Sequence, residues 1–262
     1  MGVRDRGIAA AIFAGLVVVY ALSPVEHLGD ARYSLLLSES LLRDGRVSLE
    51  RFFAPPLDAS RTPGIQDWET APPRRSGTPY QLEWEGERAY LLYPPGTALL
   101  SLPWVATLNA AGLSSIAPDG GYDRAGEERM QRILAAPLAA AIAALWFAIA
   151  RRRGLALAPA LGVAAAVGLA SPLWSTGSRG MWSHGYSVLL VSLMVAELLA
   201  AADGRRAPRA VLLASLCGLA VFVRPTNVAA GALVGAHLLA QRPAAAWRYA
   251  AAGAGWAGAF LL

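Results

Sequence analysis

The sequence predicts an all-α membrane protein with about seven transmembrane helices and a long first extracytoplasmic loop that carries membrane-parallel helices. Three observations support this prediction. Long apolar stretches recur along the chain, and the mean hydropathy is +0.41. Charged residues make up only 16% of the 262 residues, against about 25% in soluble proteins. The basic residues, all of them arginine, gather in some connecting segments and are sparse in others, as in multi-span proteins.

Seven apolar segments are predicted to cross the membrane, several of them only with help from flanking residues. They are residues 7–22, 130–150, 154–172, 185–202, 209–223, 226–240 and 246–262. An eighth apolar segment, 90–112, holds Pro94, Pro95, Gly96 and Pro103. Such a segment is typical of a helix that lies at or dips into the membrane interface, so we expect it not to cross.

The distribution of arginine supports this topology. If 90–112 does not cross, the short loops on one side carry only Arg179 and Arg224. The other side then carries Arg4, Arg6, Arg151, Arg152, Arg153, Arg205, Arg206, Arg209, Arg242 and Arg248. The positive-inside rule places that arginine-rich side, and with it the N-terminus, in the cytoplasm.

The topology predicts one transmembrane module over residues 1–262 with an extracytoplasmic loop over 23–128. Within the loop we expect interfacial helices at about 30–44 and 92–112. Asp30 suits the start of the first, Asp44-Gly45 suits its end, and an apolar face docks it to the membrane. That face consists of Leu35, Leu36, Leu41 and Leu42. Residues 54–88 are expected to form an irregular surface excursion.

The end of the sequence and its residue types carry further expectations. The last residues, GAGWAGAFLL, remain apolar, so we expect C-terminal spans or a further domain to be missing. A single cysteine, Cys217, excludes a disulfide within the chain, and the three histidines lack the spacing of a zinc site. No cluster of carboxylates at ligand spacing stands out, so no cofactor is required and a divalent metal is not indicated. The net charge of +5 indicates topology, not nucleic-acid binding.

Five stretches give the chain a resemblance to a known family. In order, they are GDARYSLLLSESLLRDGRVSLE, YLLYPPGTALLSLPW, ERMQRILAAPLAAAIAALWFAIARRRG, LWSTGSRGMWSH and GLAVFVRPTN. Together they resemble polytopic glycosyltransferases of the C superfamily, on the bacterial family-39-like branch similar to dolichyl-phosphate-mannose protein mannosyltransferases and the lipid A aminoarabinose transferase. The resemblance implies a seven-span module with two membrane-parallel helices in its first loop.

The resemblance also implies roles for single residues. Asp30 matches the acid that acts as general base on the acceptor. Arg224, Arg179 and Arg132 are the candidates to hold the lipid phosphate of the donor. The mannosyltransferases carry an Asp-Glu pair, whereas Ala31 follows Asp30 here. A second acid would come from Glu26 or Glu39, and Tyr93 and His184 are further candidates to face the substrate.

These roles predict a hexosyl- or pentosyltransferase of the bacterial cell envelope, a multi-pass protein of the inner membrane. It would move a sugar, with inversion, from a polyprenyl phosphate to a lipid, glycan or protein acceptor outside the cytoplasm. The alternative is a transporter or flippase-like protein without transferase activity.

Each candidate residue also has a structural interpretation. Asp30 would be only a helix cap, and Tyr93 would only start the interfacial helix. Arg224 and Arg132 would anchor helix ends at the interface, and His184 would belong to an aromatic belt with Trp174 and Trp182.

Overall fold

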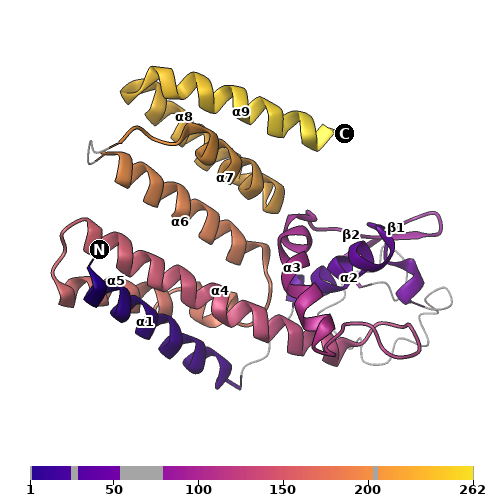
Figure 1. Ribbon diagram of the computed structural model, residues 1–262. Coiled ribbons are helices and arrows are strands. Elements are labelled where there is room, and N and C mark those ends of the chain that lie inside the picture. Colours follow the sequence, from indigo (N-terminus) through magenta and orange to yellow (C-terminus); the bar gives the residue numbers. More distant parts are fainter. Residues whose placement is uncertain (1, 25–28, 54–78, 203–205, 262) are drawn as a thin grey trace. The chain divides into compact units, whose positions relative to one another are not determined.

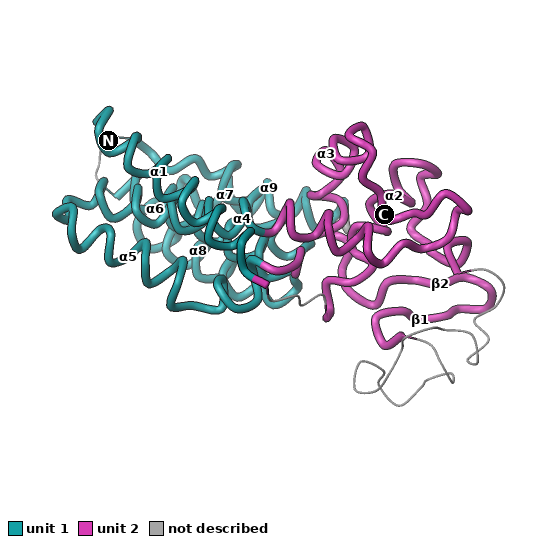
Figure 2. Tube along the Cα trace, turned by 90° about the horizontal axis from the view of Figure 1, so that it is seen from below, with its two compact units in different colours: residues 1–23, 136–178, 183–262 teal, residues 24–135, 179–182 magenta. Residues whose placement is uncertain are grey.

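The computed structural model describes residues 2–24, 29–53, 79–202 and 206–261, and these are mostly helical (Figure 1). The chain divides into two compact units, coloured separately in Figure 2. Unit 1 comprises residues 1–23, 136–178 and 183–262, and unit 2 comprises residues 24–135 and 179–182. The longest helix, α4 (Arg124–Arg152), contributes its first turns to unit 2 and the rest to unit 1.

Unit 1 is built from helices. Besides α4 they are α1 (Val3–Ala21), α5 (Leu157–Leu169), the π-helical turn η4 (Leu173–Gly177), α6 (Ser183–Ala202), α7 (Ala210–Val223), the 3-10 turn η5 (Pro225–Asn227), α8 (Val228–Gln241) and α9 (Pro243–Leu261). Two of these, α4 and α6, are long and apolar enough to cross a membrane. The apolar helices α5 and α7 have 13 and 14 residues, or about 20 Å of helix, against a hydrocarbon core about 30 Å thick. The arrangement of seven spans therefore stays a prediction.

The helices of unit 1 pack through small and apolar residues. Phe147 of α4 is fully buried with Ala160 and Ala164 of α5. The Tyr20 hydroxyl of α1 donates a hydrogen bond of 2.6 Å to the carbonyl of Gly168 on α5. Helix α7 packs against α6, α8 and α9. A Cβ added at Gly218 would lie 2.5 Å from the Trp256 ring, so close packing of α7 and α9 requires glycine there.

Unit 2 combines short helices with a β-hairpin. Its elements are the 3-10 turn η1 (Gly29–Ala31), α2 (Ser34–Asp44), the 3-10 turn η2 (Glu50–Phe52), β1 (Leu82–Glu85), β2 (Arg88–Leu91), α3 (Gly96–Ala110) and the start of α4. Its core contains Leu36, Leu37, Leu49, Phe52 and Leu82. With Ala98 of α3, residues of α2, η2 and β1 thus bury one shared apolar cluster.

The expectation of an irregular segment over 54–88 is wrong at its C-terminal end. Strands β1 and β2 pair antiparallel with Leu82 opposite Leu91, and Gly86 begins the two-residue turn with a φ of 62°. A glycine with positive φ as the first residue of such a turn suits the twist of a hairpin. Residues 54–78 of that prediction lie outside the described residues.

The first helix of the predicted loop begins later than expected. Asp30 lies in η1, and α2 begins at Ser34, because Tyr33 adopts a left-handed conformation that interrupts the helix. The predicted end is confirmed, since Gly45 caps α2 with a φ of 64°. Leu35 and Leu36 are fully buried inside the protein. The prediction that they dock the helix to a membrane is therefore wrong.

Candidate functional site

The carboxylate of Asp30 is the centre of the candidate site. The hydroxyl of Tyr80 donates a hydrogen bond of 2.6 Å to its Oδ1 atom, and the hydroxyl of Tyr93 also bonds the carboxylate. Gly29 and residues 31–40 are all buried, whereas Asp30 itself is partly exposed. An ionised carboxylate has about four acceptor positions. Two phenols can therefore orient Asp30 and still leave room for a further donor.

Tyr93 is fixed beside Asp30 by the turn that precedes α3. Pro94 and Pro95 restrict the backbone between Tyr93 and the first residue of the helix, Gly96. The pKa of Tyr93 is raised above its usual value of 10.0, mainly by burial and to a smaller extent by the hydrogen bond to Asp30 and the charge of that group. The phenol consequently remains a hydrogen-bond donor to Asp30 throughout the physiological pH range.

The turn that presents Asp30 has an unusual backbone. Gly29 has a φ of 40°, and Tyr33 is the one residue other than glycine with positive φ among the described residues, at 68°. Such a conformation costs a bulky residue on the order of 1–3 kcal/mol. The Tyr33 ring lies 4.9 Å from the ring of Tyr122 and 5.4 Å from that of Phe53, between centroids. Packing of the buried ring offsets the backbone cost and fixes the turn.

Glu127, in the first helical turn of α4, stabilises the backbone conformation that follows Asp30. Its carboxylate is fully buried and accepts hydrogen bonds from the backbone N–H groups of Tyr33, at 3.0 Å, and Leu35, at 3.2 Å. The Tyr122 hydroxyl donates a third at 2.7 Å, and the Gln131 amide a fourth at 3.3 Å. One buried side chain thus connects α4, α2 and the segment before α4.

Gln131 joins the Asp30 turn to residues 179–182. Its Nε2 donates to the carbonyl of Ala31 at 2.8 Å and to the hydroxyl of Ser34 at 3.2 Å. Its Oε1 accepts a hydrogen bond from the backbone N–H of Met181. All of these atoms belong to unit 2 and the Gln131 side chain is fully buried. The side-chain amide of Gln131 therefore bonds both the residue after Asp30 and the segment that contains Arg179.

Three other predicted site residues also belong to unit 2. Arg179 is buried, and Arg132 is an exposed residue of α4. Glu39 is fully buried, and its carboxylate accepts bonds from Ser115 at 2.5 Å (backbone) and 2.9 Å (hydroxyl), Ser114 at 2.7 Å and Arg43 at 3.4 Å. This geometry favours a structural role for Glu39 over a contact with substrate. Glu26 lies outside the described residues.

Arg224 and His184 belong to unit 1. Arg224 is partly exposed after the end of α7, and its Nε donates to the hydroxyl of Thr226 at 3.1 Å. His184 is exposed in the first turn of α6. The Asn227 amide donates to the Ser187 hydroxyl at 2.8 Å and so ties the start of α6 to η5. Within unit 1, His184 and Arg224 thus lie at the same end of the helices.

Tyr80, Glu127 and Gln131 were not predicted as site residues. Tyr80 follows a segment rich in proline and carries no motif of its own. Glu127 and Gln131 are one helical turn apart, which would have indicated a shared face. Their partners lie about 100 residues away, at Ala31 and Tyr33.

Comparison with protein-family models, curated proteins and solved structures finds no match for this chain.

Proposed function

We propose that this chain is an integral-membrane glycosyltransferase that moves a sugar from a polyprenyl phosphate to an acceptor outside the cytoplasm. It would be a multi-pass protein of a bacterial inner membrane with a cytoplasmic N-terminus and about seven spans. Two helices that are long and apolar enough to cross a membrane support the membrane location. The arginine distribution supports the orientation.

The observation that carries the proposal is the setting of Asp30. It is an oriented and partly exposed carboxylate within an otherwise buried segment. An acceptor hydroxyl or amine is a weak nucleophile until a positioned base takes its proton. A carboxylate held by Tyr80 and Tyr93, with acceptor positions to spare, suits that task. The strained turn on either side of it is typical of functional sites.

The proposed reaction is a single displacement. The acceptor oxygen or nitrogen, losing its proton to Asp30, forms a bond to the anomeric carbon. The bond from that carbon to the phosphate oxygen breaks, the polyprenyl phosphate leaves with its electron pair, and the configuration inverts. An arginine contact is needed where negative charge grows on the phosphate. Arg179 is the first candidate because Gln131 connects its segment to the Asp30 turn. Arg132 and Arg224 are the others.

The proposal is tested by the variant Asp30→Asn in proteoliposomes supplied with polyprenyl-phosphate sugars and an envelope extract as the source of acceptors. Asparagine keeps an acceptor oxygen for Tyr80 but cannot take a proton. We expect release of polyprenyl phosphate to fall about 10²- to 10⁴-fold. The matched control is Asp44→Asn, which removes an acid that pairs with Arg51 at 2.5 Å and should keep the wild-type rate.

Full transfer activity in Asp30→Asn would contradict the proposed role of Asp30 as the general base. Movement of the lipid-linked sugar across the bilayer with no transfer, in the wild-type protein, would instead favour the transporter alternative.

A further inference from the structure

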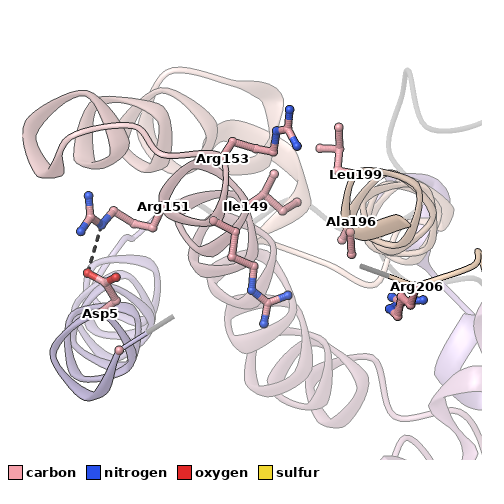
Figure 3. Close-up of a pocket in the computed structure, with 10 residues that line it drawn as sticks. Asp5, Ile149, Arg151, Arg153, Ala196, Leu199 and Arg206 are labelled. Atoms are coloured by element: carbon pink, nitrogen blue, oxygen red, sulfur yellow. Dashed lines mark hydrogen bonds and ion pairs between the residues drawn. The ribbon is translucent and has the colours of Figure 1, made fainter. Parts of the chain in front are cut away.

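A cavity lined by arginine lies at one end of the helices of unit 1. Its volume is about 570 Å³, and it is formed by the start of α1, the end of α4 with the turn to α5, the last part of α6 and Arg206. Figure 3 shows Arg151 directed toward Asp5 of α1, and Arg153 directed toward the side where Leu199 of α6 lies. Four guanidinium groups, those of Arg151, Arg152, Arg153 and Arg206, line it.

Two of the four arginines build the frame of the cavity. Arg151 donates to Asp5 at 3.0 Å and to the carbonyl of Leu155 at 2.5 Å, which joins α1 to the turn after α4. Arg206 forms a bidentate ion pair with Glu197 of α6, with N–O distances of 2.5 and 2.7 Å. These bonds hold the walls in place and neutralise part of the charge.

The other two arginines add positive charge to the cavity. Arg152 is exposed and makes no hydrogen bond or ion pair with any residue that the structure describes. Arg153 is exposed beside it. Among the described residues, the lining contains four guanidinium groups and one carboxylate, that of Asp5, and Glu197, which holds Arg206, adds a second carboxylate. In this set of described groups, positive charges outnumber negative charges by two.

Part of the lining is apolar. Ile149 of α4 and Ala196, Leu199 and Ala200 of α6 form that part. A soluble anion would gain nothing from such a wall, whereas a lipid places a charged phosphate next to the start of its acyl chains. A basic pocket between helices on the cytoplasmic side is typical of sites for anionic lipid headgroups.

We propose that this cavity binds an anionic phospholipid of the cytoplasmic leaflet, with Arg152 and Arg153 in contact with the phosphate and Ile149 and Leu199 in contact with the lipid chain. Guanidinium groups suit this ligand because they bind phosphate oxygens with two parallel N–H bonds and keep their charge at any physiological pH. This inference rests on the membrane location within the proposed function, and it is independent of sugar transfer.

The test compares lipid binding by purified protein and a double variant, Arg152→Ala with Arg153→Ala. Phosphatidylglycerol and phosphatidylcholine are titrated separately into detergent-solubilised protein, and bound lipid is counted by native mass spectrometry. We expect the double variant to lose at least tenfold in affinity for phosphatidylglycerol and to change little toward phosphatidylcholine. The single variant Arg152→Ala, whose side chain holds no other described residue, guards against a folding defect and should lose part of the affinity.

The matched control is Arg46→Ala with Arg88→Ala, which removes the same two charges from exposed positions of unit 2. Its affinity for phosphatidylglycerol should stay within twofold of the wild-type value. Equal loss in the control and the test variant would overturn the proposal, since it would show attraction to total charge only. Unchanged binding in the folded test variant would overturn it as well.

Two further measurements complete the test. One distinguishes a lipid phosphate from a soluble phosphate as the ligand, and the other distinguishes failure of the lipid site from failure of the proposed sugar transfer. Inorganic phosphate at millimolar concentration should not displace the lipid, and displacement would show that the site takes a soluble anion instead. Sugar transfer is measured on the same samples. Lost lipid selectivity together with normal transfer would support this inference without bearing on Asp30. Wild-type protein that transfers sugar but does not prefer phosphatidylglycerol would overturn the lipid site alone.

Discussion

The two compact units are stabilised by different kinds of contact. In unit 1, helices make up most of the structure and satisfy most of their own backbone groups, and they pack through small residues such as Ala160, Ala164 and Gly218. In unit 2, helices alternate with 3-10 turns, a hairpin and connecting segments, and two buried carboxylates, Glu39 and Glu127, accept hydrogen bonds from backbone and side chains far away in the sequence. Helix starts and connecting segments leave N–H groups without helical partners, and each buried one must find an acceptor.

The difference teaches where a single substitution is most harmful. Apolar contacts are spread over many atoms, so the loss of one is limited. A buried acceptor shared by several donors concentrates the cost, because its removal leaves every donor unsatisfied at once. We therefore expect the sensitive positions of unit 2 to include buried carboxylates and those of unit 1 to be mostly small or apolar, with the buried Glu197 as an exception.

The largest effect on stability is expected for Glu127→Ala. Three donors lose this acceptor, the N–H groups of Tyr33 and Leu35 and the hydroxyl of Tyr122, whereas the Gln131 amide keeps Ala31 and Ser34 as acceptors. At about 1–3 kcal/mol for each buried unsatisfied group, the free energy of unfolding should fall by on the order of 3–5 kcal/mol. Denaturant unfolding in detergent measures this loss, and hydrogen exchange should show that it is confined to unit 2.

The neighbouring residue provides the control for that substitution. Glu128 pairs with Arg124 at 2.7 Å in a contact that solvent reaches. Glu128→Ala should cost only about 0.3–0.5 kcal/mol, as exposed pairs within one helix do. Equal losses in the two variants would contradict a special role for the buried carboxylate.

Alkaline pH should weaken unit 2. Burial raises the pKa of Tyr33 from 10.0 to about 12, so the unfolded chain releases this proton first as pH rises. Stability is unaffected below pH 10 and falls between pH 10 and 12, by on the order of 2 kcal/mol for this residue. The melting temperature followed against pH, together with absorbance of tyrosinate, measures the loss. The variant Tyr33→Phe should lose less stability over this range. If its melting temperature falls between pH 10 and 12 as much as that of the wild-type protein, Tyr33 does not contribute.

A smaller effect is expected on catalysis when Gln131 is changed to leucine. The carbonyl of Ala31 and the N–H of Met181 lose their partners, and Asp30 is no longer aligned. If transfer occurs as proposed, kcat should fall about tenfold, which corresponds to about 1.4 kcal/mol, with KM for the acceptor within twofold. A purely structural role would instead lower the amount of folded protein and leave kcat per folded molecule unchanged. Gln131→Glu, which keeps the acceptor for Met181, should recover part of the rate.

Among the buried positions, the smallest effect is expected in unit 1 for Tyr20→Phe. The variant loses the hydrogen bond to the carbonyl of Gly168 and keeps the ring. Stability should fall by about 0.6–1.5 kcal/mol. Thermal unfolding in detergent measures the change. A loss as large as that of Glu127→Ala would remove the contrast between the units.

The sequence predicted much of unit 1 and less of unit 2. Apolar length alone indicated the helices, because an isolated helix satisfies its own backbone. The hairpin was missed although Leu82, Trp84, Ala89 and Leu91 frame the pair Gly86-Glu87, a signal for a two-residue turn. The start of α2 was missed because no local rule predicts a tyrosine with positive φ, which depends on the rings of Phe53 and Tyr122.

For the site, single residues could be chosen but not their neighbours. Asp30 and Tyr93 were both predicted as site residues, and the structure brings them together. Tyr80 and Gln131 reach Asp30 and Ala31 over 50 and 100 positions of sequence. Such contacts come from the tertiary fold, which a local pattern does not encode.

The cap of α2 has a consequence for how this chain can change over evolution. An acid beside a helix start ordinarily bonds the first N–H groups of that helix. Here those N–H groups bond a carboxylate 94 and 92 positions away, and the acid next to the helix, Asp30, is not used as the cap. If Asp30 is the base, as proposed, folding and reactivity are thereby assigned to two different acids. Selection could then alter residue 30 to retune or abolish the chemistry while the unit still folds, whereas residue 127 has little such freedom.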